Sequence, residues 1–144
     1  MPTAGPGWFL PPSPGDIVWC RFPQRELSGP GPKSRPALVL RVGEAQGSPV
    51  VEVAYGTSRK VDELYAGEFA IRPSDGPAYE SAGLSFPTKF NLGRTFELDF
   101  NDVWFVIPSG APCGQTPKLG ILHPSLVRRA RAARDAATRV KRRE

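Results

Sequence analysis

The sequence predicts a small, mainly β protein with a helix at its C-terminal end. Short segments of alternating apolar and polar residues follow one another at close spacing, which is typical of a compact barrel or sandwich. The chain of 144 residues contains 15 glycines and 17 prolines, and these residues favour many tight turns. A helical pattern begins only near residue 124. The length suits one domain with one hydrophobic core.

Seven segments have the pattern expected of β-strands, and turn-forming residues separate them. They are residues 16–22, 36–42, 50–57, 67–72, 86–90, 94–100 and 102–107. Residues 76–84 are expected to form one or two helical turns. The expected organisation is a Pro/Gly-rich arm over residues 1–14, a β-barrel domain over residues 15–122 and a basic helix over residues 123–144.

The C-terminal segment is predicted to be one amphipathic helix, with Pro124 in its first turn and Ser125 as a nearby cap. Apolar residues recur there at helical spacing and form one narrow stripe: Leu126, Ala130, Ala133, Ala137 and Val140. Most of the arginines lie opposite this stripe. Such a helix either packs on its own domain with a solvated basic face, or presents its arginines to RNA or to a protein partner.

The basic character of the chain comes from this helix. The net charge is +5, and residues 128–143 contain eight basic side chains against the single acidic residue Asp135. Residues 1–127 are therefore close to neutral. A nucleic-acid site on the body of the protein must then be a local basic patch rather than a field of the whole molecule.

The chain lacks the patterns of most metal and cofactor sites. Two cysteines, Cys20 and Cys113, are too few for a disulfide framework or a zinc site, and Cys20 is expected to be a small buried hydrophobe. The single histidine, His123, stands at the start of the terminal helix, where a structural role is favoured. Carboxylates are scattered singly and no glycine-rich phosphate loop occurs, so neither a two-metal nuclease nor a cofactor is expected.

Nothing in the sequence predicts a membrane protein. The first 15 residues have no basic start and hold several prolines, which is unlike a signal peptide. No apolar run approaches the roughly 18 residues of a membrane span. The expected location is the cytoplasm.

A lone arginine, Arg35, lies at the start of the second predicted strand, directly before Pro36. Proline restricts the residue before it to extended backbone, so Arg35 is not expected in a helix. A guanidinium offers a planar set of donors that suits a phosphate or a developing phosphorane. The alternative is an ordinary surface arginine at a strand end.

Hydroxyl groups end the third predicted strand, where Thr57 and Ser58 follow Gly56. The glycine would let the backbone approach a ligand closely, and the hydroxyls would hydrogen-bond a phosphate. Arg59 and Lys60 come next and would hold flanking phosphates. Simple turn chemistry explains the same residues equally well.

The segment PTKFN places Lys89 and Asn91 on one face of a short strand and Phe90 on the other. Such a strand either presents a cation and an amide to nucleic acid or forms a sheet edge guarded by lysine. Aromatic residues such as Tyr55 either stack on bases or build the core.

Taken together, several of these segments resemble a known family. The chain carries GDIVWCRF, a Gly/Pro loop, SRPALVL, YGTS and GLSFPTKFNL in this order, and it resembles the PemK/MazF family of bacterial toxins up to about residue 107. The resemblance implies an SH3-like (CcdB/PemK-type) small β-barrel with short helices, usually a homodimer. It also implies a metal-independent endoribonuclease that cuts single-stranded RNA at short sequences, and an antitoxin partner that restrains it.

The resemblance implies roles for particular residues. Arg35 matches the arginine of the family's RP-apolar-V-apolar segment, and Thr57 matches its catalytic threonine, with Ser58 as the alternative one residue on. Some members have an aspartate where this chain has Asn91, which cannot act as a general base. The implied reaction is attack of a 2′-hydroxyl on the adjacent phosphorus, giving a 2′,3′-cyclic phosphate and a 5′-hydroxyl.

Other residues are expected along the RNA. Asp16, Glu26 and Lys89 are the candidates for the general base, and the loop over residues 23–34 would form a mobile wall over the RNA. The RNA-binding residues expected from the sequence are Arg59, Lys60, Lys89, Asn91, Asp16 and Glu26. Three alternatives remain open: an inactive RNA- or protein-binding module on the same fold, a CcdB-like gyrase poison, and a phage- or defence-associated relative that binds another protein through the basic helix.

Overall fold

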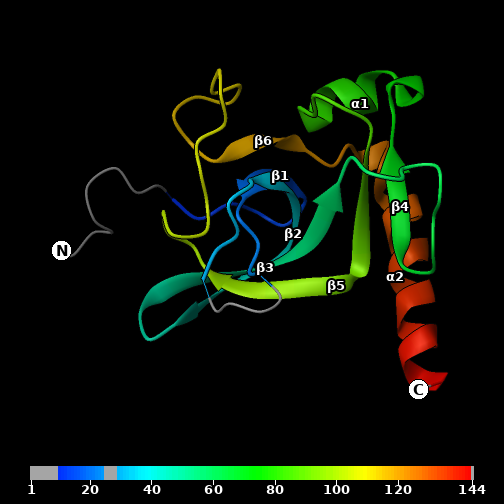
Figure 1. Ribbon diagram of the computed structural model, residues 1–144, viewed down its shortest axis with the longest axis horizontal. Coiled ribbons are helices and arrows are strands. Elements are labelled where there is room, and N and C mark those ends of the chain that lie inside the picture. Colours follow the sequence, from blue (N-terminus) through cyan, green and yellow to red (C-terminus); the bar gives the residue numbers. More distant parts are fainter. Residues whose placement is uncertain (1–9, 25–28, 144) are drawn as a thin grey trace.

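The computed structural model of the chain describes residues 10–24 and 29–143, and its core is one antiparallel sheet of six strands (Figure 1). The strand order in the sheet is β4-β5-β3-β2-β1-β6. The strands are β1 (Asp16–Cys20), β2 (Arg35–Ala45), β3 (Ser48–Thr57), β4 (Glu68–Ile71), β5 (Thr88–Asp99) and β6 (Lys118–Ile121). The helices are η1 (Pro73–Asp75), α1 (Pro77–Ala82), η2 (Pro124–Leu126) and α2 (Val127–Arg143).

The sheet has a buried cluster on each face, because successive side chains of a strand point to opposite sides. Ile17, Leu38 and Phe90 belong to the cluster that α1 and α2 cover. Val18 and Val53 belong to the other cluster, which lies under the loops that follow β5. The mainly β fold expected from the sequence is confirmed.

Strand β5 turns a corner in the middle, and this corner bends the whole sheet (Figure 1). In its pairing with β3, Ala54 lies opposite Thr95 while the next residue, Tyr55, lies opposite Asn91. The extra residues on β5 form a bulge, which bends a strand and increases its twist. The predicted strands 86–90 and 94–100 are thus the two arms of one bent strand.

The sheet differs in three details from what the sequence indicated. The barrel is not closed, since no strand pairing within the described residues joins β4 to β6 at the two edges. Residues 102–107 do not form a strand: Asn101 accepts hydrogen bonds from Val103 and Phe105 and closes a turn over residues 102–104, after which Phe105 makes only an isolated bridge to Cys20. Strand β6 was not predicted from the sequence.

Helix α2 packs along β4 and β5 at the end of the sheet (Figure 1). Four residues of the expected stripe are buried, whereas Val140 is 43% exposed near the end of the helix. The buried residues are Leu126, Ala130, Ala133 and Ala137. The small alanines allow close approach, as expected. His123 caps the first turn, since its Nδ1 accepts a hydrogen bond from the amide of Ser125.

An ion pair also holds α2 to the sheet. The guanidinium of Arg129 donates to both carboxylate oxygens of Asp75, at 3.0 and 3.1 Å, and to the carbonyl of Ala70. The hydrogen bonds from Arg129 hold the pKa of Asp75 below its usual value. Among the described residues, no helix is long and apolar enough to cross a membrane.

Candidate functional site

A cleft of about 540 Å³ opens where β2 begins and β3 ends. Its floor and walls come from four parts of the chain: the end of β1, the β2–β3 strand ends, the segment after α1 and the loop before β6. The lining residues that carry polar side chains are Ser34, Arg35, Thr57, Ser58, Ser85, Thr88 and Ser109, together with the indole of Trp19. The cleft thus combines one guanidinium with several hydroxyl groups.

Strand pairing brings Arg35 and Thr57 together from positions 22 residues apart in the sequence. Strands β2 and β3 are antiparallel, with Ala37 opposite Tyr55. When this register is continued by two residues, Arg35 lies opposite Thr57. Ser58 follows directly, and all three residues line the same cleft.

Gly56 is required for this arrangement. A Cβ atom at this position would lie 2.4 Å from the carbonyl oxygen of Pro36 and 2.8 Å from the ring of Phe90. The glycine therefore allows β3 to approach β2 and the Phe90 ring, rather than a ligand as the sequence had indicated. This close packing sets the separation between Thr57 and Arg35.

The side chain of Thr57 has a defined role in its turn. Its Oγ1 accepts a hydrogen bond of 3.1 Å from the amide of Arg59. A hydroxyl that accepts from an amide still has its own proton to donate, so Thr57 can bind an anionic oxygen in the cleft. The hydroxyl of Ser58 is more exposed.

Arg35 is half-buried and lies beside an aromatic ring. Its guanidinium carbon is 5.8 Å from the centre of the Tyr55 ring. Within residues 10–24 and 29–143, no hydrogen bond or ion pair occupies the Arg35 side chain. Its donors are therefore available to an anion in the cleft.

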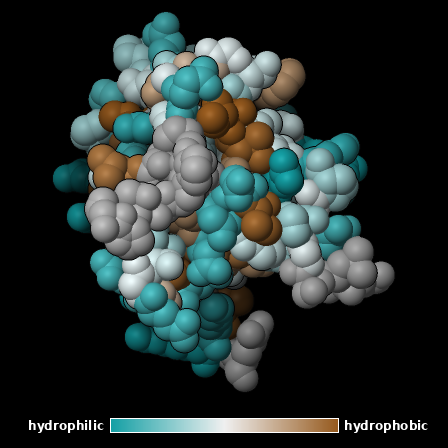
Figure 2. All heavy atoms as spheres, turned by 90° about the vertical axis from the view of Figure 1, so that its left-hand side faces the viewer, coloured by the Kyte–Doolittle hydropathy of each residue, from teal (hydrophilic) through white to brown (hydrophobic). Residues whose placement is uncertain are grey.

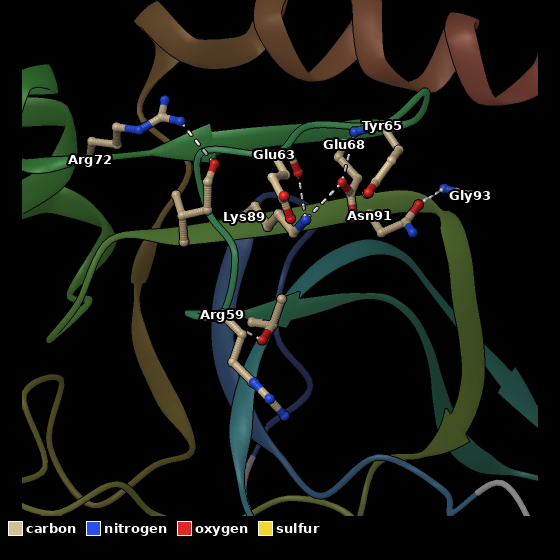
Figure 3. Close-up of polar contacts among 10 residues, drawn as sticks. Arg59, Glu63, Tyr65, Glu68, Arg72, Lys89, Asn91 and Gly93 are labelled. Atoms are coloured by element: carbon tan, nitrogen blue, oxygen red, sulfur yellow. Dashed lines mark hydrogen bonds and ion pairs between the residues drawn. The ribbon is translucent and has the colours of Figure 1, made fainter.

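Lys89 does not line this cleft. Its side chain is 7% exposed, and its ammonium donates to the carboxylate of Glu68 at 2.9 Å and to the carbonyl of Glu63 at 2.8 Å (Figure 3). The same ammonium lies 5.5 Å from the centre of the Tyr65 ring. A cation already buried and paired in this way anchors the loop before β4 to β5.

Asn91 also makes a structural contact. Its side-chain oxygen accepts a hydrogen bond of 2.8 Å from the amide of Gly93, at the corner of β5 (Figure 3). Asp16 is buried, lies 3.3 Å from the ammonium of Lys118 and caps the amide of Ser13. Neither residue lines the cleft.

The remaining predicted residues lie at the margin of the site. Arg59 and Lys60 are exposed in the turn after Ser58 and do not line the cleft, although Lys60 lines an adjoining hollow of about 720 Å³. Arg72 holds that turn in place by donating to the carbonyl of Val61 (Figure 3). The candidate base Glu26 and part of the predicted mobile wall lie outside the described residues.

Two features of the site were missed from the sequence. The loop over residues 108–112 forms one wall, and the aromatic ring of Phe86, 65% exposed, stands between the cleft and the adjoining hollow. The second feature is Arg94, whose guanidinium carbon lies 4.2 Å from the centre of the Tyr55 ring. For the wall and the Phe86 ring, the only signal in the sequence was the phenylalanine of the segment GLSFP.

Among the described residues that line the cleft, none is a cysteine or a histidine. Burial raises the pKa of the Cys20 thiol, which keeps it protonated and unreactive, as expected for a core residue. In the part of the chain that the structure describes, no group of three or more histidine, cysteine or acidic side chains is arranged to hold a metal ion. The cleft offers hydrogen-bond donors and one positive charge.

These features define a small β protein whose strand-end cleft presents a guanidinium and hydroxyl groups to an anion. A family model for the PemK-like, MazF-like toxins of type II toxin–antitoxin systems matches residues 13–103. This match covers more than half of the chain, and the chain belongs to that family. Such toxins are generally endoribonucleases with an antitoxin partner. No curated protein matches the chain significantly.

Proposed function

We propose that this chain is a toxin that cleaves single-stranded RNA at short sequences without a metal ion. The observation that carries the proposal is the presence of Arg35, Thr57 and Ser58 in one cleft. The family supports RNA as the substrate in general. As in the resemblance noted above, we propose a homodimer that acts in the cytoplasm and is restrained by its antitoxin.

The proposed reaction is an attack of the RNA's own 2′-hydroxyl on the neighbouring phosphorus. The bond from the 2′-oxygen to phosphorus forms, the bond from phosphorus to the 5′-oxygen breaks, and a proton passes to the leaving oxygen. The products are a 2′,3′-cyclic phosphate and a 5′-hydroxyl. Negative charge on the phosphorane oxygens rises during the reaction, so donors aimed at these oxygens lower the barrier.

The residues of the cleft suit this charge stabilisation. Arg35 supplies a permanent positive charge and several donors to the phosphorane, and a guanidinium group is a poor base. Thr57 would donate its hydroxyl proton to a phosphate oxygen, and Ser58 would support it. Among the described residues that line the cleft, none is a carboxylate or an imidazole, so the predicted base Glu26 remains the candidate to test.

The inactive-module alternative loses its main argument. It depended on Asn91 replacing a catalytic aspartate, but the Asn91 side chain is engaged with the amide of Gly93 and does not line the cleft. An amide there is explained by the corner of β5. No observation in the structure favours the gyrase-poison alternative.

The experiment is cleavage of a long single-stranded RNA by the purified protein in excess EDTA, with a matched single-stranded DNA. We expect cutting of RNA only, with 5′-hydroxyl ends, because DNA lacks the 2′-hydroxyl. Arg35→Ala should lower the rate by about 10²–10³, the usual effect of removing one donor to a developing oxyanion. The matched control is Arg41→Ala, since Arg41 lies on the same strand but pairs with Glu52.

Three results would contradict the proposal. Cutting that stops in EDTA would make the reaction metal-dependent. Equal cutting of DNA would exclude attack by the 2′-hydroxyl. Binding of RNA without cleavage by the folded wild-type protein would favour the inactive binding-module alternative.

A further inference from the structure

Two guanidinium groups lie close to the ring of Tyr55. Arg35 approaches it from β2 at 5.8 Å and Arg94 approaches it from β5 at 4.2 Å, both measured to the ring centre. The two guanidinium carbons are therefore no farther apart than the sum of these distances. A second cation thus lies beside the one that faces the cleft.

The corner of β5 places Arg94 there. The bulge opposite Ala54 and Tyr55 inserts residues 92–94 into β5, and Asn91 stabilises the corner through the amide of Gly93. Arg94 then lies on the same face as Phe96, whose ring is 5.9 Å from its guanidinium carbon. A straight strand would place residue 94 at another position relative to Tyr55.

Arg94 is exposed and has no carboxylate partner among the residues that the structure describes. Two other exposed arginines are neutralised locally, since Arg41 pairs with Glu52 and Arg129 pairs with Asp75. Arg94 differs from the exposed arginines of the β3–β4 turn and of α2 because an aromatic ring holds its guanidinium in place. Stacking on Tyr55 holds the Arg94 guanidinium in place while leaving its N–H edge free to donate. A fixed and unpaired guanidinium of this kind suits a phosphate.

Tyr55 and Thr57 link the two arginines in one strip across the sheet, in which the Tyr55 ring also packs edge-on against Phe22 with the ring centres 4.9 Å apart. Tyr55 and Thr57 belong to β3 and are two residues apart, so their side chains lie on the same face of the sheet. The order along this face is Arg94, Tyr55 and then Arg35 with Thr57. The strip is basic although the body of the protein is nearly neutral.

We propose that Arg94 binds an RNA phosphate next to the one that is cleaved. The inference rests on the proposed function, because it takes the phosphate at Arg35 and Thr57 as the reacting one. Arg94 is then a positioning residue that holds the strand in register across the cleft. Its contribution is to affinity, whereas that of Arg35 is to the chemical step.

Binding is measured first, with a single-stranded 2′-O-methyl RNA of mixed sequence that cannot be cleaved because it lacks a free 2′-hydroxyl. Affinity is followed by fluorescence anisotropy over a range of salt concentrations. Arg94→Gln should weaken binding about tenfold at low salt, and the slope of log affinity against log salt should fall by about 0.7, the value for one phosphate contact with a single strand. Arg41→Gln is the matched control and should change neither quantity.

Cleavage of unmodified RNA gives the second readout. Arg94→Gln should raise KM about tenfold while kcat at saturating RNA changes less than twofold. Arg94→Lys should restore the salt slope, since it restores the charge, and part of the affinity. The urea midpoint of Arg94→Gln should stay within experimental error of the wild type, because the side chain is exposed.

Several outcomes would overturn the assignment. An unchanged salt slope in Arg94→Gln, or a loss of stability without a change in slope, would make the stack on Tyr55 purely structural. A fall in kcat with KM unchanged would place Arg94 in the chemical step instead. If the wild type binds the 2′-O-methyl RNA but cuts no RNA, the proposed function is wrong. The salt slope of Arg94→Gln would still show whether Arg94 contacts a phosphate.

Discussion

The predicted role of Lys89 in RNA binding and its place in the structure lead to opposite expectations for one variant, Lys89→Met. Methionine keeps the length and much of the volume of the side chain but removes the charge. The change leaves the carboxylate of Glu68, 10% exposed, without its cation and removes the donor to the carbonyl of Glu63. We therefore expect a large loss of stability and no direct loss of RNA contacts.

The size of this loss follows from the burial of the pair. Removing one partner of a buried ion pair costs about 3–5 kcal/mol, because the other charge stays in a poorly solvated site. In a domain of this size, each kcal/mol lowers the melting temperature by about 3–4 °C, so the melting temperature should fall by ~10 °C or more. The exposed pair of Arg41 and Glu52 is the internal comparison, and Arg41→Met should cost about 1 kcal/mol or less.

The assays are urea denaturation at neutral pH and the salt dependence of RNA binding, measured on the same protein samples below their melting temperatures. Lys89→Met should shift the urea midpoint strongly and leave the salt slope as in the wild type. Adding Glu68→Gln should recover part of the stability, because the unpaired charge is then removed. A near-wild-type urea midpoint together with a lower salt slope would refute this reasoning and restore Lys89 as a phosphate-binding residue.

The remaining predictions concern the packing under the cleft and the attachment of α2. Gly56→Ala should destabilise the protein by about 1–3 kcal/mol and slow RNA cleavage, because the added Cβ would displace Pro36 and Phe90. The control is Gly43→Ala, whose Cβ would have no atom within 4 Å. This control should leave both the urea midpoint and the cleavage rate unchanged. Asp75→Asn should lower stability at pH 7, since the folded state holds the pKa of Asp75 below its unfolded value. That stabilisation is present above about pH 4 and is lost as the pH falls through the lower, folded pKa. The difference in free energy of unfolding between variant and wild type should therefore narrow in urea titrations near pH 3. A difference that stays constant with pH would contradict this prediction.

The sequence predicted that Arg35, Thr57 and Ser58 come together, as they do in the candidate cleft, because local patterns determine their positions. Proline after Arg35 requires extended backbone, and a glycine before Thr57 indicates close approach at a strand end, although the group that approaches proved to be Pro36 and Phe90 rather than a ligand. The alternation along two neighbouring strands then places both residues at one edge of the sheet. Only short-range regularities and one antiparallel pairing are needed for this part.

The positions of Lys89 and Arg94 depend on partners that are distant in the chain. Lys89 is buried because Glu63 and Glu68 meet it from another part of the chain, and a single lysine in a strand gives no sign of such partners. Arg94 acquires its position from a bulge that exists only in the pairing of β5 with β3. Register shifts of this kind leave no periodic trace in the sequence.

Strand β6 was missed for a similar reason. It has four residues, and its place is determined by tight contact with α1: a Cβ at Gly83 would lie 2.0 Å from the carbonyl oxygen of Leu119. This contact requires glycine at two positions that are far apart in the sequence, Gly83 and Gly120. Neither glycine looks unusual in its own segment.

The link from α2 to the turn beyond the cleft affects how the protein is made. Arg129 binds Asp75, Asp75 accepts from the amide of Arg72, and the Arg72 guanidinium holds the carbonyl of Val61. Helix α2 is synthesised after all six strands, so on the ribosome the core cluster beneath it and this turn stay incomplete until the helix has emerged. A nascent chain would therefore have the residues of the cleft before it has the contact that supports the neighbouring turn, and shortening the chain before Arg129 would remove that support without touching a residue of the cleft.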